Sequence, residues 1–401
     1  MRSEWKTVVL DEVCEIVRGG SPRPIMDFVT KNSNGINWIK IGDVAQGDKY
    51  ITHTNEKIIP KGVKSSREVV AGDLILSNSM SFGRPYILQL DGCIHDGWLR
   101  LRNNAEVLDR EYLYYFLCSK LAQDQFRAVA TGSVVNNLKS DTVKAVTLSL
   151  PMLSSQIDIV RTLSTLDNKI ALNTKINQHL EQMAQAIFKS WFVDFEPWGG
   201  VMPHSWREGT ISDLGKVIGG STPSKTKAEY YTEHGIAWVT PKDLSINRSK
   251  FIARGADDIT ELGLRNSSAR LMPRGTVLFS SRAPIGYIAI ASGEVCTNQG
   301  FKSIVPRDNV GTAFVYYFLI ENLQVIEGMA SGSTFKEVSG STMKSVPAII
   351  PDDDTLRRFQ ADCDSIFEKQ ALLEQESAHL ATLRDTLLPR LMSGELAVGD
   401  N

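Results

Sequence analysis

Two adjacent ionisable side chains, His95 and Asp96, are the residues of this sequence that most resemble an acid–base site. A histidine beside a carboxylate can take up and release a proton near neutral pH. The corresponding region of an internal repeat carries Asn298 and Gln299 instead, whose amides do not titrate. If both repeats performed one proton transfer, both would keep the ionisable pair. The two positions therefore favour hydrogen-bonded recognition of two different targets over catalysis.

Other catalytic and ligand-binding patterns are absent from the sequence. It has no Gly-rich loop ending in Gly-Lys-Ser/Thr, no Gly-x-Gly-x-x-Gly, no His-Glu-x-x-His and no Gly-x-Ser-x-Gly motif. The five cysteines and six histidines show no ligand or disulfide spacing, so we expect no metal site and no disulfides. Thr131-Gly-Ser133 and Ser331-Gly-Ser333 could cradle a phosphate through backbone amides, with plain loops as the alternative. We expect no enzymatic activity in this chain.

The strongest signal in the chain is a unit written twice. Matching segments recur in the same order at nearly constant offset, which is the mark of an internal repeat. The matches are Leu10–Val13 with Ile211–Leu214, Gly19-Gly20-Ser21 with Gly219-Gly220-Ser221, Gly35–Trp38 with Gly235–Trp238, Gly72–Ser77 with Gly275–Ser280, Tyr114–Leu117 with Tyr316–Leu319, and Pro151 with Pro351. The repeated aromatic residues, Trp38, Trp238, Tyr114–Phe116 and Tyr316–Phe318, are expected in the core rather than stacked on a ligand.

Each repeat ends in a long amphipathic stretch. From Ser154 to Trp191 a narrow apolar stripe recurs at alternating four- and three-residue steps without Gly or Pro, as in a coiled coil. The stripe comprises Ile159, Leu163, Leu166, Ile170, Asn173, Asn177, Leu180, Ala184 and Ile187. The same spacing returns 200 residues later in Phe359, Cys363, Ile366, Gln370, Leu373, Ser377, Leu380, Arg384 and Leu387. We predict two long helices paired antiparallel; two ordinary amphipathic helices in separate cores are the alternative.

The expected fold class is α+β, with two pseudo-repeated mixed α/β domains separated by two long helices that form an antiparallel coiled coil. The boundaries are 1–152 for the first domain, 153–198 for the central helical spacer, 199–352 for the second domain and 353–401 for the distal helical spacer and tail. Strands are expected at Ile36–Ile41, Asp73–Leu76, Gly97–Leu101 and Val143–Leu148, and further helices at Arg110–Val129 and Ala313–Met329. The two termini are expected close together, with a pseudo-two-fold axis across the helix pair.

Charge is distributed unevenly along the chain. The net charge is −2, yet residues 1–150 and 201–351 together carry +5, while 151–200 and 352–401 carry −7. An anionic ligand is therefore expected on the domains rather than on the helices. No apolar run approaches the roughly 18 residues of a spanning helix, and Met1–Leu10 lacks a secretory leader pattern, so a cytoplasmic protein with no membrane partner is expected.

The order of several motifs resembles the DNA-specificity subunit of type I restriction-modification systems, over the whole chain. The motifs of the second repeat are Gly235–Leu244, Ser280–Gly286, Thr297–Lys302 and Ser331–Lys336, and the helix ends are Ser190–Glu196 and Leu387–Leu396. The first repeat departs from the pattern. It has Ser79–Gly83 in place of the Arg-containing loop and Ile94–Gly97 in place of the Asn-Gln motif.

The resemblance implies a non-catalytic subunit that reads double-stranded DNA with a bipartite, asymmetric target. Each domain would bind one half-site, and the helix pair would set their spacing and dock two methyltransferase subunits. Those subunits would bring S-adenosylmethionine and adenine methylation, and restriction subunits would add ATP- and Mg-dependent translocation and cleavage. No cofactor is expected in this chain. Two readers on a rigid spacer would need half-sites about one helical turn, roughly 34 Å, apart.

The resemblance also implies DNA contacts from polar residues of the repeated loops. In the second repeat Arg282 is expected on guanine, Asn298 and Gln299 on adenine, and Lys242, Lys302 and Lys336 on phosphates. In the first repeat the candidates are Arg18, Arg23, Lys40, Asn78, Arg84, His95 and Lys139. Subunit docking is expected at Trp191, Phe192, Phe195, Leu387 and Leu391, with packing against the facing helix as the alternative. The competing interpretation is a two-headed coiled-coil scaffold that binds proteins or other ligands.

Overall fold

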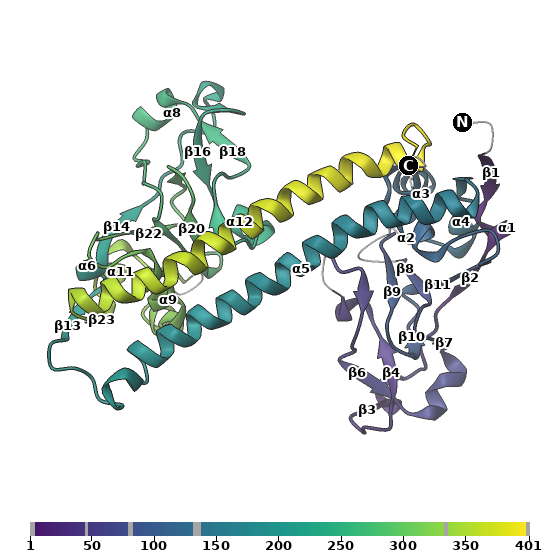
Figure 1. Cartoon of the computed structure of the whole chain (residues 1–401), viewed down its shortest axis with the longest axis horizontal. Coiled ribbons are helices and arrows are strands. Elements are labelled where there is room, and N and C mark those ends of the chain that lie inside the picture. The colour runs from purple at the N-terminus through teal and green to yellow at the C-terminus, as the bar shows by residue number, and fades with distance from the viewer. Residues whose placement is uncertain (1–4, 45–46, 79–82, 131–137, 333–335, 398–401) are drawn as a thin grey trace. The chain divides into compact units, whose positions relative to one another are not determined.

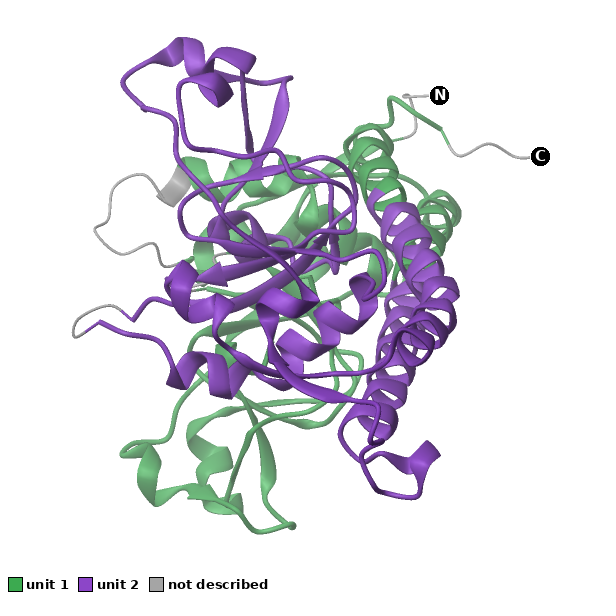
Figure 2. Ribbon diagram, turned by 90° about the vertical axis from the view of Figure 1, so that its left-hand side faces the viewer, with its two compact units in different colours: residues 1–170, 379–401 green, residues 171–378 purple. Residues whose placement is uncertain are grey.

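The computed structural model describes residues 5–44, 47–78, 83–130, 138–332 and 336–397 (Figure 1). The chain forms two compact units, one of residues 1–170 with 379–401 and the other of 171–378 (Figure 2). Each unit combines a β-rich domain with parts of both long helices, which confirms the predicted α+β class. The helices are α5 (Leu153–Phe192) and α12 (Asp353–Met392), each of 40 residues, where long helices were predicted.

The long helices run antiparallel within each unit, as predicted. In the second unit Asn173 donates to the carboxylate of Glu376 at 2.8 Å, and Phe188, further along α5, packs on Phe359, which comes earlier in α12. In the first unit Asp167 of α5 binds Arg384 of α12 at 2.8 Å. The predicted stripe is buried or half-buried along both helices, because those positions face the partner helix or the adjoining domain.

The first domain contains two five-stranded sheets and one two-stranded antiparallel sheet. The sheet orders are β2-β11-β8-β9-β5 and β3-β6-β4-β10-β7, and β1 pairs with β12. The elements are β1 Lys6–Val9, α1 Leu10–Val13, β2 Cys14–Arg18, β3 Val29–Thr30, β4 Ile36–Ile39, β5 Tyr50–Ile51, β6 Glu56–Ile58, β7 Arg67–Val69, β8 Leu74–Ser77, β9 Pro85–Leu88, β10 Gly92–Ile94, β11 Trp98–Asn103, α2 Arg110–Cys118, α3 Lys120–Ala130, α4 Ser140–Lys144 and β12 Thr147–Leu150.

The second domain repeats this plan. Its sheets are ordered β14-β22-β19-β20-β17 and β15-β18-β16-β21, and β13 pairs with β23. The elements are β13 Arg207–Thr210, α6 Ile211–Leu214, β14 Gly215–Gly219, β15 Tyr231–Thr232, β16 Ile236–Val239, α7 Pro241–Ile246, β17 Phe251–Ile252, β18 Asp257–Ile259, α8 Glu261–Arg265, β19 Val277–Ser281, β20 Ile285–Ala291, β21 Cys296–Thr297, β22 Lys302–Pro306, α9 Thr312–Glu321, α10 Leu323–Gly328, α11 Gly340–Lys344 and β23 Pro347–Ile350.

Each domain core is completed by both long helices. Ile159 and Leu163 of α5 pack with Leu388, Leu391 and Met392 of α12 into the core of the first unit. The first and last described segments also meet there, since a side-chain carbon at Gly394 would lie 3.3 Å from the indole of Trp5. The predicted proximity of the termini therefore holds for the described residues. The repeated Trp and Tyr-Tyr-Phe residues are all buried, which confirms their predicted core role.

Three local predictions were wrong. The single helix predicted for Arg110–Val129 breaks at Ser119, whose hydroxyl donates to the Phe116 carbonyl at 2.6 Å and whose backbone is extended. Its counterpart in the second repeat breaks at Asn322, whose amide donates to the Phe318 carbonyl at 2.9 Å. Short polar side chains that bond the preceding turn compete with helix continuation. The strand predicted for Val143–Leu148 begins only at Thr147, because Ser140–Lys144 form the helix α4.

Candidate functional site

The polar loops of the second repeat converge on the carboxylate of Glu337. Arg282, in the loop after β19, binds one oxygen of Glu337 at 3.3 Å, and Lys302, at the start of β22, binds the other at 3.2 Å. The Lys302 ammonium also donates to the Ser281 hydroxyl at 3.4 Å and to the Gln299 carbonyl at 3.5 Å. Two of the predicted contact residues therefore share one counter-ion, which keeps both cations close together.

The neighbouring residues Asn298 and Gln299 have different geometries. Asn298 is half-buried, and its side-chain oxygen accepts from the backbone N–H of Gly300 at 2.9 Å, so this side chain shapes its own turn. Gln299 is exposed, and its side-chain oxygen accepts from the hydroxyl of Thr222. The Asn298 acceptor is therefore engaged within the protein, whereas the Gln299 amide lies at the surface.

Two further lysines of the second repeat lie exposed beside this turn. Lys242 is the second residue of α7, and the preceding Pro241 borders the turn, since a side-chain carbon at Gly300 would lie 3.0 Å from its ring. Lys336 is the residue before Glu337. The structure thus brings all six predicted residues of this repeat into one neighbourhood. Ser331 and Gly332 belong to the described residues, but Ser333 does not.

In the first repeat, four predicted residues gather around Asp96. Its backbone carbonyl accepts from Arg18 Nε at 3.2 Å and from Asn78 Nδ2 at 2.8 Å. Its carboxylate accepts from the Ser21 hydroxyl at 2.7 Å and lies 3.7 Å from the guanidinium of Arg23, which is 83% exposed. His95 precedes it in the chain. Asp96 itself was not predicted as a contact residue.

Electrostatic effects at this turn favour a charged Asp96 and a neutral His95. The Ser21 hydrogen bond lowers the pKa of Asp96 more than burial raises it. Burial lowers the pKa of His95, whose ring meets Trp38 edge-on at 6.2 Å between centroids. His95 Nδ1 accepts from the backbone N–H of Gly97 at 2.7 Å, so in this geometry it carries no proton.

The three other predicted residues of the first repeat differ in placement. Lys40 follows Ile39, whose carbonyl accepts from the His95 backbone, and its ammonium pairs with Glu56. Lys139 is exposed at the start of α4, and the preceding Leu138 donates its backbone N–H to the Asn78 carbonyl at 2.8 Å. Arg84 is hydrogen-bonded through its backbone to Ser77, the residue before Asn78, and it lines a cavity of about 430 Å³ together with Tyr86, Asp167 and Arg384. Thr131–Ser133 and Ser79–Phe82 lie outside the described residues.

Matching hydrogen bonds identify the equivalent positions of the two repeats. Gly20 donates to the Ile94 carbonyl as Ser221 donates to that of Thr297, and Gly19 donates to Trp98 as Gly220 donates to Phe301. The side chain of residue 95 accepts from Gly97 as that of residue 298 accepts from Gly300. Asn78 N–H meets the Gly97 carbonyl at 2.9 Å, and Ser281 N–H meets that of Gly300 at 2.7 Å.

This pattern corrects the sequence alignment by one residue. Gly19 corresponds to Gly220 rather than Gly219, and Ser21 corresponds to Thr222. Asp96 consequently corresponds to Gln299, and His95 to Asn298. Sequence reasoning missed Ser21, Asp96 and Thr222. A hydroxyl residue after each Gly-containing turn was a visible signal, but the residue that this hydroxyl binds lies more than 70 positions later in the chain.

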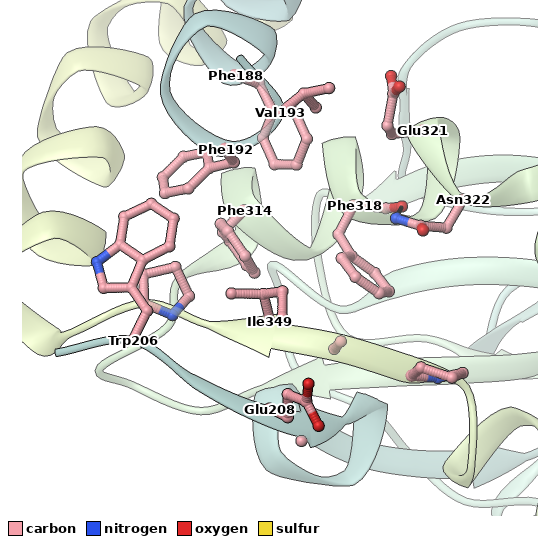
Figure 3. A pocket seen from close by; sticks show the side chains of 14 residues that line it. Phe188, Phe192, Val193, Trp206, Glu208, Phe314, Phe318, Glu321, Asn322 and Ile349 are labelled. Atoms are coloured by element: carbon pink, nitrogen blue, oxygen red, sulfur yellow. Dashed lines mark hydrogen bonds between the residues drawn. The ribbon is translucent and has the colours of Figure 1, made fainter. Parts of the chain in front are cut away.

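The predicted docking residues are packed to different extents. Trp191, Phe192 and Phe195 are half-buried, and Figure 3 shows Phe192 facing Phe314 and Trp206 beside a cavity of about 660 Å³ in the second unit. The ring centroids of Phe192 and Phe314 are 4.9 Å apart. Packing, the alternative interpretation, accounts for these contacts. In the first unit Leu387 is half-buried and Leu391 is only 1% exposed within the core.

Two other kinds of site are absent from the described residues. No three His, Cys, Asp or Glu side chains among them are placed to share a metal ion. No helix in this part of the chain combines the length and apolar character needed to cross a bilayer.

Comparisons with known proteins agree with the residue pattern. A family model for the type I restriction modification DNA specificity domain matches residues 2–182 and 203–369. The HindI specificity subunit of Haemophilus influenzae is 27% identical over 471 residues, covering 98% of this chain and 100% of that protein. The MjaIX specificity subunit of Methanocaldococcus jannaschii is 44% identical over 154 residues, covering 38% and 35%. The crystal structure of a type I restriction-modification S subunit from M. genitalium has a TM-score of 0.58 at 16% identity, covering 97% and 96%, and shares the fold.

Proposed function

The chain belongs to the family of type I restriction modification DNA specificity domains, and we propose that it is the non-catalytic subunit that reads the DNA target of such a system. The observation that carries this proposal is the shared hydrogen-bond framework of the two repeats. One framework presents His95 and Asp96 in the first repeat but Asn298 and Gln299 in the second. A symmetric enzyme would keep its chemistry, whereas a reader of an asymmetric target needs different groups on equivalent scaffolds.

Each repeat would read one half of a split target. We propose 1–152 and 199–352 as the two reading domains, and 153–198 and 353–401 as the helical spacers. Antiparallel helices suit a rigid spacer, and half-sites about one helical turn, roughly 34 Å, apart would present the same face of the duplex. Exposed Lys242, Lys336 and Lys139 would meet phosphates, and Arg282 would reach a base once Glu337 releases it.

Several of the predicted residues would act by shaping the reading surface. The acceptors of Asn298 and His95 hold the turn, and Asn78, 4% exposed, holds the Asp96 carbonyl. Arg18 donates to the same Asp96 carbonyl. In the second repeat Lys302 donates to the corresponding carbonyl of Gln299. Arg23 is largely exposed and would turn to a phosphate. For Lys40 and Arg84 we propose phosphate contacts at the edges of the surface.

The partners would be double-stranded DNA, two methyltransferase subunits and restriction subunits, all acting with this chain in the cytoplasm. S-adenosylmethionine, ATP and Mg would be bound by those subunits. The half-buried rings of Trp191, Phe192 and Phe195 and the side chain of Leu387 would contribute to docking. Leu391, enclosed in the core, would contribute by holding the end of α12 in place.

Methylation mapping tests this proposal. The host genome is sequenced for methylated adenines with this gene present and deleted, and we expect one split motif that disappears on deletion. Binding of the assembled complex to duplex DNA should also fall steeply as salt rises, because released counter-ions drive phosphate contacts. A purified chain that methylated DNA by itself would contradict the non-catalytic role. If assemblies of the chain did not bind DNA even at low salt, the competing interpretation, a scaffold that binds proteins or other ligands, would be supported instead.

A further inference from the structure

One position, half-buried in the first repeat and exposed in the second, is equivalent in the two repeats and differs in its hydrogen-bonding groups. It is Asp96 in the first repeat and Gln299 in the second. Each residue follows a side chain that caps the turn, His95 or Asn298, and precedes the glycine, Gly97 or Gly300, that the cap holds. The backbone framework is therefore the same, and the difference lies in one side chain.

A hydroxyl from the preceding Gly-containing turn orients this side chain in both repeats. Ser21 donates to Asp96 Oδ1 at 2.7 Å, and it also accepts from the Asp96 backbone N–H at 3.3 Å. Thr222 donates to the side-chain oxygen of Gln299. Each hydroxyl thus engages one oxygen. The second terminal atom is Oδ2 in Asp96, which lies 3.7 Å from the guanidinium of Arg23, and Nε2 in Gln299, which is an exposed residue. Side chains held this way lose little further freedom on binding.

These second terminal atoms differ in chemistry. A carboxylate is an acceptor only, so Asp96 Oδ2 can bind a base that offers an amino group in the major groove, cytosine N4 or adenine N6. The Nε2 of Gln299 is a donor, and its oxygen keeps a second lone pair, so this amide can bind adenine at N7 and N6 together. The contact of Asp96 with Arg23 does not block this use, because an ion pair with an 83% exposed arginine is weak.

We propose that residue 96 in the first repeat and residue 299 in the second determine specificity for one base pair in each half of the target. Ser21 and Thr222 are the positioning residues that hold them. Asp96 selects a base with a major-groove amino group, and Gln299 selects adenine. The inference rests on the proposed function, and it adds which atom of each repeat makes the selection. Asp96 is ionised at neutral pH, because its ordinary pKa of 3.8 is already far below 7 and the Ser21 hydrogen bond lowers it further.

The test uses the chain assembled with its methyltransferase subunits, S-adenosylmethionine and a library of duplexes with randomised positions. Methylated molecules are sequenced for the wild type, for Asp96→Asn and for Gln299→Glu. Asp96→Asn keeps the oxygen that Ser21 binds and replaces the other carboxylate oxygen by an amide nitrogen. We expect the wild type to prefer an amino-bearing base at one position by about 5-fold to 150-fold, and Asp96→Asn to lose that preference in one half-site only.

The matched control is Glu106→Gln, which neutralises an exposed carboxylate away from this turn and should leave the motif unchanged. Gln299→Glu should alter one position of the other half-site, which keeps the test decisive if Asp96→Asn abolishes assembly. Ser21→Ala should weaken selectivity at the position that Asp96 reads, with the other half unchanged. Unchanged motifs in both variants, or uniform weakening at every position, would overturn the inference. The proposed function would fail separately, through a wild type that yields no split motif.

Discussion

The two domains are attached to the long helices by the same kind of contact, but the cation of the contact comes from different elements. In the first unit Tyr115 donates to Asp167 of α5 at 2.5 Å, and the counter-ion of Asp167 is Arg384 of α12. In the second unit Tyr317 bonds Glu181 of α5 at 3.2 Å, and the counter-ion is Lys250 of the domain itself. A tyrosine of the domain and a carboxylate of α5 are thus common to both attachments. The cation belongs to α12 in the first unit and to the domain in the second.

Lys49 and Lys250 occupy equivalent positions in the two domains but bind different partners. Lys49, beside β5, binds Glu111 of its own domain at 3.0 Å. Lys250, beside β17, is 6% exposed and binds Glu181, Tyr317 and Gln370 at 2.7–3.0 Å, with the Phe367 ring 3.6 Å away. In the second unit one buried lysine thus contacts the tyrosine, the α5 carboxylate and a glutamine of α12, whereas in the first unit Lys49 contacts the tyrosine and Arg384 contacts the α5 carboxylate.

The largest effect is expected at the glycines that make the two turns equivalent. A side-chain carbon would lie 2.1 Å from the His95 carbonyl oxygen at Gly19 and 1.9 Å from that of Asn298 at Gly220. Gly19→Ala and Gly220→Ala should each lower the free energy of unfolding by about 3 kcal/mol or more, measured in urea. Gly219→Ala is the matched control, since its nearest neighbour would be 3.9 Å away. Tolerance of Gly220→Ala with damage from Gly219→Ala would restore the alignment suggested by sequence.

Lys250→Met should have the next largest effect. It removes the cation that Glu181 and Gln370 surround and leaves their acceptors without it. Burial lowers the pKa of Lys250 to about 8, so the side chain is still mostly charged at pH 7. We expect the free energy of unfolding of the second unit to fall by about 2–3 kcal/mol, measured in urea at pH 7. Lys49→Met should cost less, and an equal loss in both variants would contradict the comparison of the two attachments.

Arg282→Ala should weaken DNA binding by the assembled complex by roughly 1–3 kcal/mol and relax selectivity at a single base of one half-site. Arginine binds guanine through two parallel hydrogen bonds, which alanine cannot replace. The measurement is the binding of duplexes that vary one position at a time. Equal weakening for every duplex would make Arg282 a phosphate contact. Lys336→Ala is the comparison, since an exposed lysine on a phosphate should weaken all sequences alike.

The smallest effect is expected from His95→Asn, which gives the first repeat the turn residue of the second. The folded-state pKa of His95 lies below its ordinary value of 6.5, so the unfolded chain binds more protons. Wild-type stability should therefore fall as pH drops from above 6.5 through the folded-state pKa, because protonation removes the acceptor for Gly97. The variant should lack this component. If the unfolding midpoints of the two proteins changed equally between pH 7.5 and 5, protonation of His95 would not affect the stability of the fold.

Much of the architecture could be predicted because it follows from the spacing of apolar residues along the sequence. The stripe from Ile159 to Ile187 repeats at Phe359 to Leu387, and a seam of that length requires a partner helix. The burial of Trp38 and Trp238 followed from their matched positions in strand-like runs. Residue identity and period were sufficient for these features.

The details of the site could not be predicted in this way. The alignment of Gly19 with Gly219 maximised identical letters, but the turn geometry matches Gly19 to Gly220. Asp96 was missed because its orientation depends on Ser21, 75 residues earlier. Lys250 was missed for the same reason, since Glu181 and Gln370 are distant in sequence. Such contacts depend on the folded topology rather than on local pattern.

The contribution of α12 to the core of the first unit has a consequence for biosynthesis. Leu388, Leu391 and Met392 fill that core beside Ile159 and Leu163, although they leave the ribosome only after the whole second domain. The first domain therefore emerges early but lacks part of its core until α12 has been synthesised. A chain truncated just before α12 would leave an apolar surface uncovered on a domain whose own sequence is intact.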